Sequence, residues 1–120
     1  MLDDLKLSEL RKANVKRCEK HYHLVTDWSL ADWMTAVTSE VGELANEIKA
    51  IRRRQTESHA SGHTIRGDRA DMAEEAADII IYLDLLCARE GIDLGKAVRD
   101  KFNKVSLERL VCPECVLENE

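Results

Sequence analysis

One stretch of the chain decides its fold: Ser39-Glu40-Val41-Gly42-Glu43-Leu44-Ala45-Asn46-Glu47-Ile48-Lys49. Its apolar residues belong to a stripe with spacings of three and four, which predicts a long amphipathic helix from about residue 30 to the arginines at 52–54. The stripe consists of Trp33, Val37, Val41, Leu44, Ile48 and Ile51. The same predicted helix also carries three glutamates, at positions 40, 43 and 47.

These glutamates lie at or near the helix face that we expect to be buried. On a helical wheel Glu40 falls about 20° from Trp33. Glu47 falls about 40° from the same tryptophan, and Glu43 lies farther round on that side. An unpaired carboxylate in such a place costs free energy or takes up a proton, so a purely stabilising role does not explain the arrangement.

A second acidic run, Glu74-Glu75-Ala76-Ala77-Asp78, opens another apolar helix. If the two helices face each other, Glu40-x-x-Glu43 and Glu75-x-x-Asp78 present four carboxylates across a narrow gap. A hard cation with oxygen ligands relieves their repulsion, and Mg²⁺ is the usual choice where phosphates share the coordination. Either motif alone is weak because glutamate-rich helix surfaces are common, but the pair favours a metal site.

The rest of the sequence predicts an all-α protein, since no stretch alternates as a strand does. We expect helices over Leu5–Tyr22, from a Ser29–Asp32 capping box, over Asp71–Arg89 up to Gly91, and from Asp93 with the inner stripe Leu94, Val98, Phe102 and Val105. One domain should cover residues 1–110, followed by a tail at 111–120. The third helix is apolar almost all round in its middle, and a 120-residue monomer cannot bury such a helix, so a homodimer or homotetramer is predicted.

Two segments lack a helical period. Residues 55–71, from Gln55 to Asp71, are predicted to form a long loop, either a lid or binding loop or a plain connector. The tail carries Cys112 and Cys115 as a CxxC pair, but no second close pair completes a zinc site, so a frayed end with incidental thiols is favoured over a metal or redox site. Cys18 and Cys87 fall at apolar helical positions and are expected to be reduced core thiols.

Composition narrows the classes of partner. A net charge of −5 disfavours nucleic acid, although the arginines at 52–54, 66 and 69 give a local excess of positive charge suited to a small anionic ligand. No apolar run approaches the ~20 residues that span a bilayer, so no membrane partner is expected. The acidic start of the chain lacks the features of a signal peptide, and we expect a cytoplasmic protein.

Other metal and phosphate motifs are missing from the sequence. A di-iron carboxylate bundle needs Glu-x-x-His on two helices, and no glutamate here has a histidine three residues on. The His-Glu-x-x-His zinc motif, the Gly-x-x-x-x-Gly-Lys phosphate loop and the Gly-x-Ser-x-Gly elbow are absent as well.

The acidic motifs together resemble a known family. Glu40-x-x-Glu43, then Glu75-x-x-Asp78 followed by Ile-Ile-Ile-Tyr-Leu, is similar to the signature of the MazG-like all-α nucleoside triphosphate pyrophosphohydrolases, over about residues 28–109. The resemblance implies a four-helix bundle-type fold completed by oligomerisation as a dimer or a dimer of dimers. It also implies Mg²⁺-dependent hydrolysis of a (deoxy)nucleoside triphosphate to the monophosphate and pyrophosphate, with Mn²⁺ able to replace Mg²⁺.

The resemblance and the chemistry of the individual residues together suggest the following roles. Glu40, Glu43, Glu75 and Asp78 would hold the metal, and Glu47 would share a metal or act as a base. Candidate phosphate contacts are Lys49, Arg53, Lys101 and Asn103, although each cation could equally be a solvated charge at a helix edge. Trp28 or Trp33 would stack on the base, with plain core packing the favoured role for Trp33.

Other functions stay open at this point. A catalytically silent helical module could bind a nucleotide or a protein in the same groove. Within the enzymes, a dimeric dUTPase-like or a phosphoribosyl-ATP pyrophosphatase activity uses similar chemistry. The preferred base and sugar are not encoded in any motif that we identify.

Overall fold

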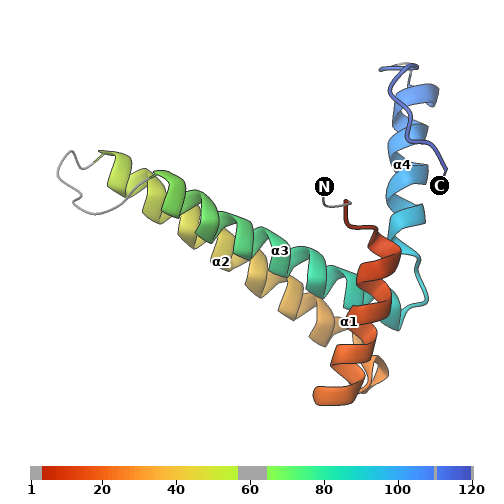
Figure 1. The fold of residues 1–120 in the computed structure, drawn as a ribbon, viewed down its shortest axis with the longest axis horizontal. Coiled ribbons are helices and arrows are strands. Elements are labelled where there is room, and N and C mark those ends of the chain that lie inside the picture. The colour runs from red at the N-terminus through yellow and green to blue at the C-terminus, as the bar shows by residue number, and fades with distance from the viewer. Residues whose placement is uncertain (1–3, 57–64, 110, 120) are drawn as a thin grey trace.

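The computed structural model describes residues 4–56, 65–109 and 111–119, with only the helical backbone at residues 65–67. This part of the chain forms α1 (Leu7–His21), a short 3-10 helix η1 (Val25–Asp27), α2 (Leu30–Thr56), α3 (Ile65–Arg89) and α4 (Leu94–Glu108) (Figure 1). The described ranges contain no strand. The predicted all-α class is therefore confirmed.

Local signals in the sequence start and stop these helices where expected. Ser29 and Asp32 cap the start of α2 reciprocally, with Ser29 N donating to Asp32 Oδ2 at 2.9 Å and Asp32 N donating to Ser29 Oγ at 3.1 Å. After α3, Gly91 adopts a φ of 68°, which lets Ile92 N donate to Cys87 O at 2.8 Å. Asp93 caps α4 by accepting a hydrogen bond from Lys96 N at 3.0 Å.

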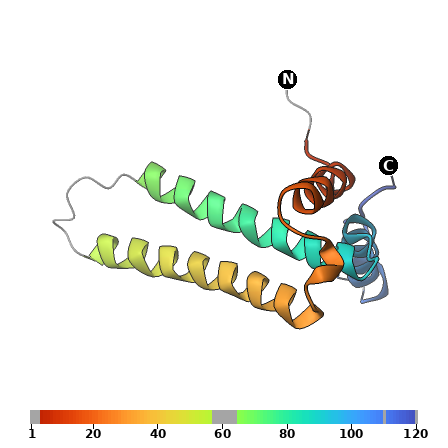
Figure 2. The same cartoon turned by 90° about the horizontal axis from the view of Figure 1, so that it is seen from below.

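The two long helices form an antiparallel hairpin that dominates the molecule (Figures 1 and 2). α1 crosses one end of this hairpin and packs against α3, and α4 stands apart from the hairpin and packs mainly against α1. A single chain therefore supplies the four helices of the expected bundle without closing it.

The core lies where α1, η1 and the hairpin meet. Trp33 is only 1% exposed, and its indole Nε1 donates to Val25 O at 2.8 Å. Cys18 and Leu85 are buried against it, with Val15, Trp28 and other partly buried residues around them. The free thiols Cys18 and Cys87 are both buried, as the sequence predicted.

A buried polar network fixes α1 on α3. Asp84 is fully buried and accepts hydrogen bonds from Arg11 Nε at 2.9 Å and from Asn14 Nδ2 at 3.1 Å. Asn14 Nδ2 also donates to Ile81 O at 2.9 Å, and Arg11 Nη2 donates to Ile92 O at 2.6 Å. Because a buried charge needs both a partner and hydrogen bonds, this network stabilises α1 in its position on α3.

The predicted apolar stripe of α2 is wrong in part. The face of α2 toward α3 carries the residues at 33, 37, 40, 44, 47 and 51, all buried or half-buried. Val41 and Ile48 belong instead to an exposed side, where each is 47% exposed. Both residue sets follow helical spacing, and the structure turns inward the set that includes Glu40 and Glu47.

The predicted loop at residues 55–71 is also too long. α2 continues to Thr56 and α3 already begins at Ile65, while residues 57–64 lie outside the described residues. An ion pair between Arg54 and the buried Asp68 joins the two helices near this end. This tertiary contact stabilises the first turn of α3 against α2, in a segment where the sequence shows no helical period.

Two further expectations fail at the C-terminal end. Val98 and Phe102, predicted to face inward on α4, are about half exposed at 48% and 47%. The tail was expected to be frayed, but residues 111–119 fold back onto α4, and Cys112 and Cys115 are joined by a disulfide. None of the helices in the described part of the chain is both long and apolar enough to cross a bilayer.

Candidate active site

Three carboxylates meet in the middle of the hairpin. Glu40 and Glu43 come from α2 and Glu75 from α3, and one carboxylate oxygen of each lies within 4.8 Å of the others. The i, i+3 spacing puts the first two on neighbouring positions of α2, and the antiparallel α3 brings the third opposite them. The predicted juxtaposition of the two acidic motifs is thus present in the structure for these three residues.

The cluster has unmet bonding capacity. Glu40 Oε2 and Glu75 Oε2 are buried and have no hydrogen-bond partner. Among the described residues, no lysine or arginine forms an ion pair with either carboxylate. Buried carboxylate oxygens without partners are costly, so this arrangement calls for a positive charge between the helices.

The same environment raises the pKa values of two of the carboxyl groups. Desolvation raises the pKa of Glu75 from its ordinary 4.5 to about 7, helped by a hydrogen bond to Glu43 and by the charges of Glu43, Glu40 and Asp78. Desolvation also raises the pKa of Glu40, followed by the influence of Glu43 and Asp78. Without a cation, the cluster therefore holds a proton near neutral pH.

These observations fit a hard divalent cation. Oxygen ligands on facing helices, with buried atoms left unpaired, are the donor set that Mg²⁺ or Mn²⁺ prefers. Asp78 is not part of the three-oxygen group, but it is half-buried and close enough for its charge to raise the pKa values of Glu40 and Glu75. It lies one helical turn beyond Glu75 on α3.

An aromatic pocket lies next to the acidic cluster, and Asp78, one helical turn beyond Glu75, belongs to its lining. Its volume is about 340 Å³, within the range of small-ligand pockets. Aromatic rings dominate its wall, and these belong to Tyr22, His23, Trp28, Trp33 and Tyr82. The pocket thus combines flat apolar surfaces with a carboxylate at the edge of the candidate metal site.

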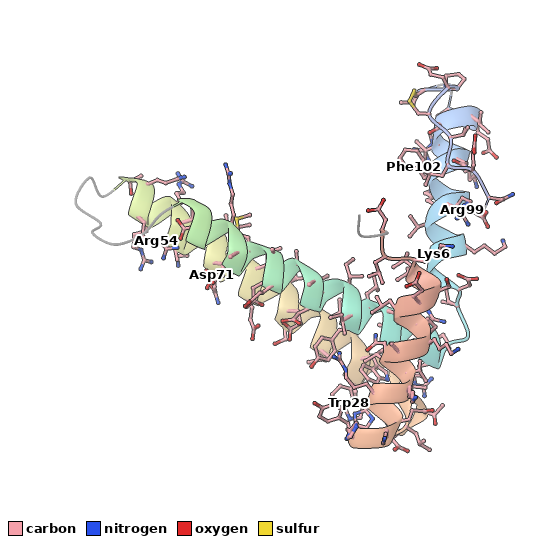
Figure 3. The ribbon with its side chains drawn as sticks, viewed as in Figure 1. Lys6, Trp28, Arg54, Asp71, Arg99 and Phe102 are labelled. Atoms are coloured by element: carbon pink, nitrogen blue, oxygen red, sulfur yellow. A yellow bond between two sulfur atoms is a disulfide. The ribbon has the colours of Figure 1, made fainter. Side chains whose placement is uncertain are left out.

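The rings are packed against one another in a fixed order. His23 stacks on Trp28 with ring centroids 4.6 Å apart and planes at 28°. Trp28 also meets Trp33 at 4.6 Å with planes at 52°, and Trp33 meets Tyr82 at 6.5 Å. Figure 3 shows Trp28 at the end of the hairpin that α1 crosses, with Arg54 at the opposite end. Trp33 is a core residue that also contributes to the pocket wall.

Sequence reasoning missed the contribution of α1 to this pocket. Asn14 and Arg17 line it, three residues apart on α1, and no motif pointed to either. Tyr82 could have been found, because it follows Asp78 by four residues and therefore shares its helix face. Burial raises the pKa of Tyr82, and the charges of Glu40 and Asp78 raise it further.

The other predicted site residues of α2 lie outside the acidic cluster. Glu47 is half-buried one turn beyond Glu43, on the side facing α3. Lys49 and Arg53 are exposed and lie farther toward the end of α2. The structure thus leaves Glu47 within one turn of the cluster and the two cations on the surface.

Lys101 and Asn103 are separated from the carboxylates of their own chain. Both belong to α4, which stands apart from the hairpin (Figure 1). Lys101 is exposed beside the tail, and the amide of Asn103 is engaged with the backbone of Leu117. Within one chain, both residues therefore lie away from the acidic cluster.

Comparison with known proteins agrees with this geometry. The family model described as the MazG nucleotide pyrophosphohydrolase domain matches residues 29–109, which include the whole acidic cluster, Asp78 and α4. A search among curated proteins finds no significant match. Because the match covers well over half of the chain, the protein belongs to the MazG nucleotide pyrophosphohydrolase domain family.

Proposed function

We propose that this protein is a Mg²⁺-dependent pyrophosphohydrolase that converts a (deoxy)nucleoside triphosphate to its monophosphate and pyrophosphate. The observation that carries the proposal is the meeting of three carboxylate oxygens within 4.8 Å, next to an aromatic pocket that is lined by the neighbouring Asp78. Family membership supports the reaction class. The aromatic pocket next to the carboxylate cluster supports a substrate with a planar base at one end and phosphates at the other.

The acidic residues are assigned to the metal. Glu40, Glu43 and Glu75 would hold Mg²⁺ or Mn²⁺, with Asp78 as a fourth oxygen ligand on the side of the pocket. When bound, the cation neutralises phosphate charge and makes water a better nucleophile at neutral pH. The overall step is attack of water on the α-phosphorus, with cleavage of the bond to the bridging oxygen and departure of pyrophosphate.

The remaining groups bind and orient the substrate. Glu47, one turn from Glu43, either binds a second cation or accepts the proton of the attacking water. Trp28, with one face on His23, stacks on the base, and Asn14 and Arg17 contact its edge from α1. Lys49 and Arg53 are charged groups on the exposed side of α2 that can attract the phosphates.

We further propose that the working form is a homodimer or a homotetramer. Four apolar residues of α2, at positions 30, 34, 41 and 48, are each about half exposed and fall within about 40° on the helix. A second copy that covers this strip completes the bundle. Lys101 stands apart from the carboxylates of its own chain, so it can serve as a phosphate contact only in the site of a partner copy.

The reaction is tested by incubating the purified protein with each nucleoside triphosphate and Mg²⁺, and by separating monophosphate and pyrophosphate by ion-exchange chromatography. We expect turnover of at least one triphosphate and its loss in Glu43→Gln. Glu74→Gln is the matched control, since Glu74 is exposed on α3 and outside the cluster. Full activity in Glu43→Gln would overturn the assigned metal site.

Binding and turnover separate the proposal from its rivals. A catalytically silent module would bind nucleotide with Mg²⁺ in a calorimeter but release no product from any triphosphate. Cleavage restricted to dUTP, or to phosphoribosyl-ATP, would place the protein with the narrower enzymes of similar chemistry. The role of Lys101 in a partner site is tested by mixing Glu43→Gln and Lys101→Met chains, which should restore part of the activity that each lacks alone.

A further inference from the structure

The C-terminal tail is held on α4 by hydrogen bonds to its backbone. Asn103 Nδ2 donates to Leu117 O at 2.8 Å, and Leu117 N donates to Asn103 Oδ1 at 2.7 Å. Arg99 Nε donates to Glu118 O at 2.9 Å. In Figure 1 the chain from residue 111 to residue 119 runs back along α4, and Figure 3 shows Arg99 on the same helix. The side-chain amide of Asn103 therefore binds both the N–H and the C=O of Leu117, as the backbone of a neighbouring strand would.

The chain reverses between α4 and this tail through Cys112-Pro113-Glu114-Cys115. Cys115 N donates to Cys112 O at 2.9 Å, which closes a four-residue turn, and proline is favoured at the second position of such turns. Cys112 N donates in turn to Ser106 O at 3.3 Å, which ties the start of the turn to the end of α4. The turn brings the two sulfur atoms together, and the structure joins them as a disulfide.

An apolar cavity lies between the turn and α4. Its volume is about 690 Å³, and its wall includes Val98, Phe102 and Val105 from α4 together with both cysteines. Phe102, labelled in Figure 3, is about half exposed even with the tail in place. The position of the CxxC turn thus decides how much of this apolar face is covered.

The four cysteines differ in their access to solvent. Cys18 and Cys87 are buried, and burial raises the pKa values of both thiols, so they are poor nucleophiles. Cys115 is exposed and Cys112 is half-buried. Oxidants and thiols in solution therefore reach the tail pair and not the core pair.

We propose that Cys112 and Cys115 are a site of reversible thiol–disulfide exchange that controls how firmly the tail is held on α4. The oxidising partner is a small-molecule disulfide. The exposed Cys115 thiolate attacks one sulfur of that disulfide, which breaks its S–S bond and releases one thiolate. The Cys112 thiolate then attacks the Cys115 sulfur, forms the protein disulfide and releases the second thiolate. Two protein thiols lose two protons and two electrons, and one disulfide is reduced to two thiols.

The consequence follows from the geometry of the turn. The disulfide restricts the turn to conformations that direct residues 117 and 118 toward Arg99 and Asn103. After reduction the same turn has more conformations available, so the tail leaves α4 more often. Its departure uncovers the apolar face around Phe102 and frees the amide of Asn103.

The chemistry is tested on the full-length protein with oxidised glutathione as the disulfide and dithiothreitol as the reductant. After reduction, native alkylation followed by mass spectrometry should label two thiols, and after oxidation none. Cys112→Ser should trap glutathione on Cys115, whereas Cys115→Ser should react much more slowly because Cys112 is half-buried. Cys18→Ser is the matched control and should behave as the parent chain. Labelling of two thiols in both states, or in neither, would overturn the proposal.

The coupling to the tail is tested by hydrogen exchange at the Leu117 amide. We expect exchange to be at least about tenfold faster in the reduced protein than in the oxidised one. The double variant Cys112→Ser/Cys115→Ser should match the reduced rate under both conditions, and Asn103→Ala should be fast under both. Equal Leu117 protection in oxidised and reduced protein would show that the pair does not control the tail. Retention of stoichiometric Zn²⁺ by the reduced pair would identify a metal site and also overturn the proposal.

Discussion

Glu40 and Glu75 face each other across the hairpin, and each has a buried Oε2 atom that accepts no hydrogen bond. The two oxygens come from different helices, and two negative charges at these positions would repel each other. Close packing of α2 and α3 therefore requires that the charge of this carboxylate pair is neutralised. A proton shared within the cluster does so in the absence of metal, and a cation does so in its presence. Proton binding and metal binding therefore compete at the same place.

The first prediction concerns stability without metal. The pKa of Glu75 is about 7 in the folded chain and 4.5 in its ordinary state, so the folded protein binds the proton more tightly than the unfolded protein. The stabilisation that this proton gives the folded state is complete below about pH 4.5 and is lost as the pH rises through about 7. Thermal unfolding in EDTA should show that Glu75→Gln is as stable as the parent at pH 5 and more stable at pH 8.

Metal should reverse this order. With saturating Mg²⁺ at pH 8, the parent chain should be the more stable one, because the glutamine supplies a poorer ligand for the cation. Glu74→Gln should shift the melting temperature equally at both pH values, with or without the ion, since Glu74 is exposed. A parent chain that gains no stability from Mg²⁺ at pH 8 would contradict the assigned site.

The acidic cluster was predictable because helical spacing alone places Glu40 and Glu43 on neighbouring positions of α2, although Glu43 is exposed where Glu40 is half-buried. The error lay in the apolar stripe of α2. Two overlapping residue sets have helical spacing, and hydrophobicity favours the one with Val41 and Ile48. The structure turns the other set inward, with Glu40 and Glu47 half-buried, and a cation on the carboxylates would offset the cost of burying them.

Other features depend on contacts that no local pattern encodes. Asn14 reaches the pocket because Asp84 and Ile81, about seventy residues away, bind its amide nitrogen. The start of α3 at Ile65 is supported by the ion pair of Arg54 with Asp68 across the hairpin. Local sequence signals correctly predict the end of α3 before Gly91 and the start of α4 after Asp93, where the geometry of one residue is enough.

The second prediction concerns Trp28. Its ring stacks on His23 and lines the pocket, and stacking of one base on an aromatic side chain contributes about 1–3 kcal/mol. Trp28→Ala should therefore raise the KM for the preferred triphosphate by about 5- to 150-fold, while Trp28→Phe should recover much of the loss. Hydrolysis of inorganic triphosphate, which has no base, is the control substrate. An unchanged nucleotide KM in a folded Trp28→Ala protein would exclude the stacking role.

The third prediction tests the network that docks α1. Arg11→Met leaves the fully buried Asp84 without its cation, and breaking a buried pair in this way typically costs about 3–5 kcal/mol. The double variant Arg11→Met/Asp84→Leu should recover part of that loss, because it removes the unpaired charge as well. Urea unfolding measures both.

An exposed ion pair provides the matched control for this network. Lys96 and Asp100 form such a pair on α4, with side chains 69% and 59% exposed. Lys96→Met should therefore change the free energy of unfolding by less than about 1 kcal/mol. If Arg11→Met had as small an effect as Lys96→Met, the docking of α1 would not depend on the buried pair.

The last prediction concerns the exposed strip of α2 formed by the residues at 30, 34, 41 and 48. Met34 and Ile48 are 52% and 47% exposed, and a charge at either position would be buried without a partner in an assembly that covers the strip. The double variant Met34→Glu/Ile48→Glu should therefore run as a monomer in size-exclusion chromatography with light scattering, with its helical circular dichroism retained. Leu24→Glu, at an equally exposed position outside the strip, should assemble as the parent does.

Because we place Lys101 in the site of a partner copy, the monomeric variant should also lose turnover while it still binds Mg²⁺ at its own carboxylates. A parent chain that is monomeric and active at micromolar concentration would contradict both the assembly and the partner role of Lys101.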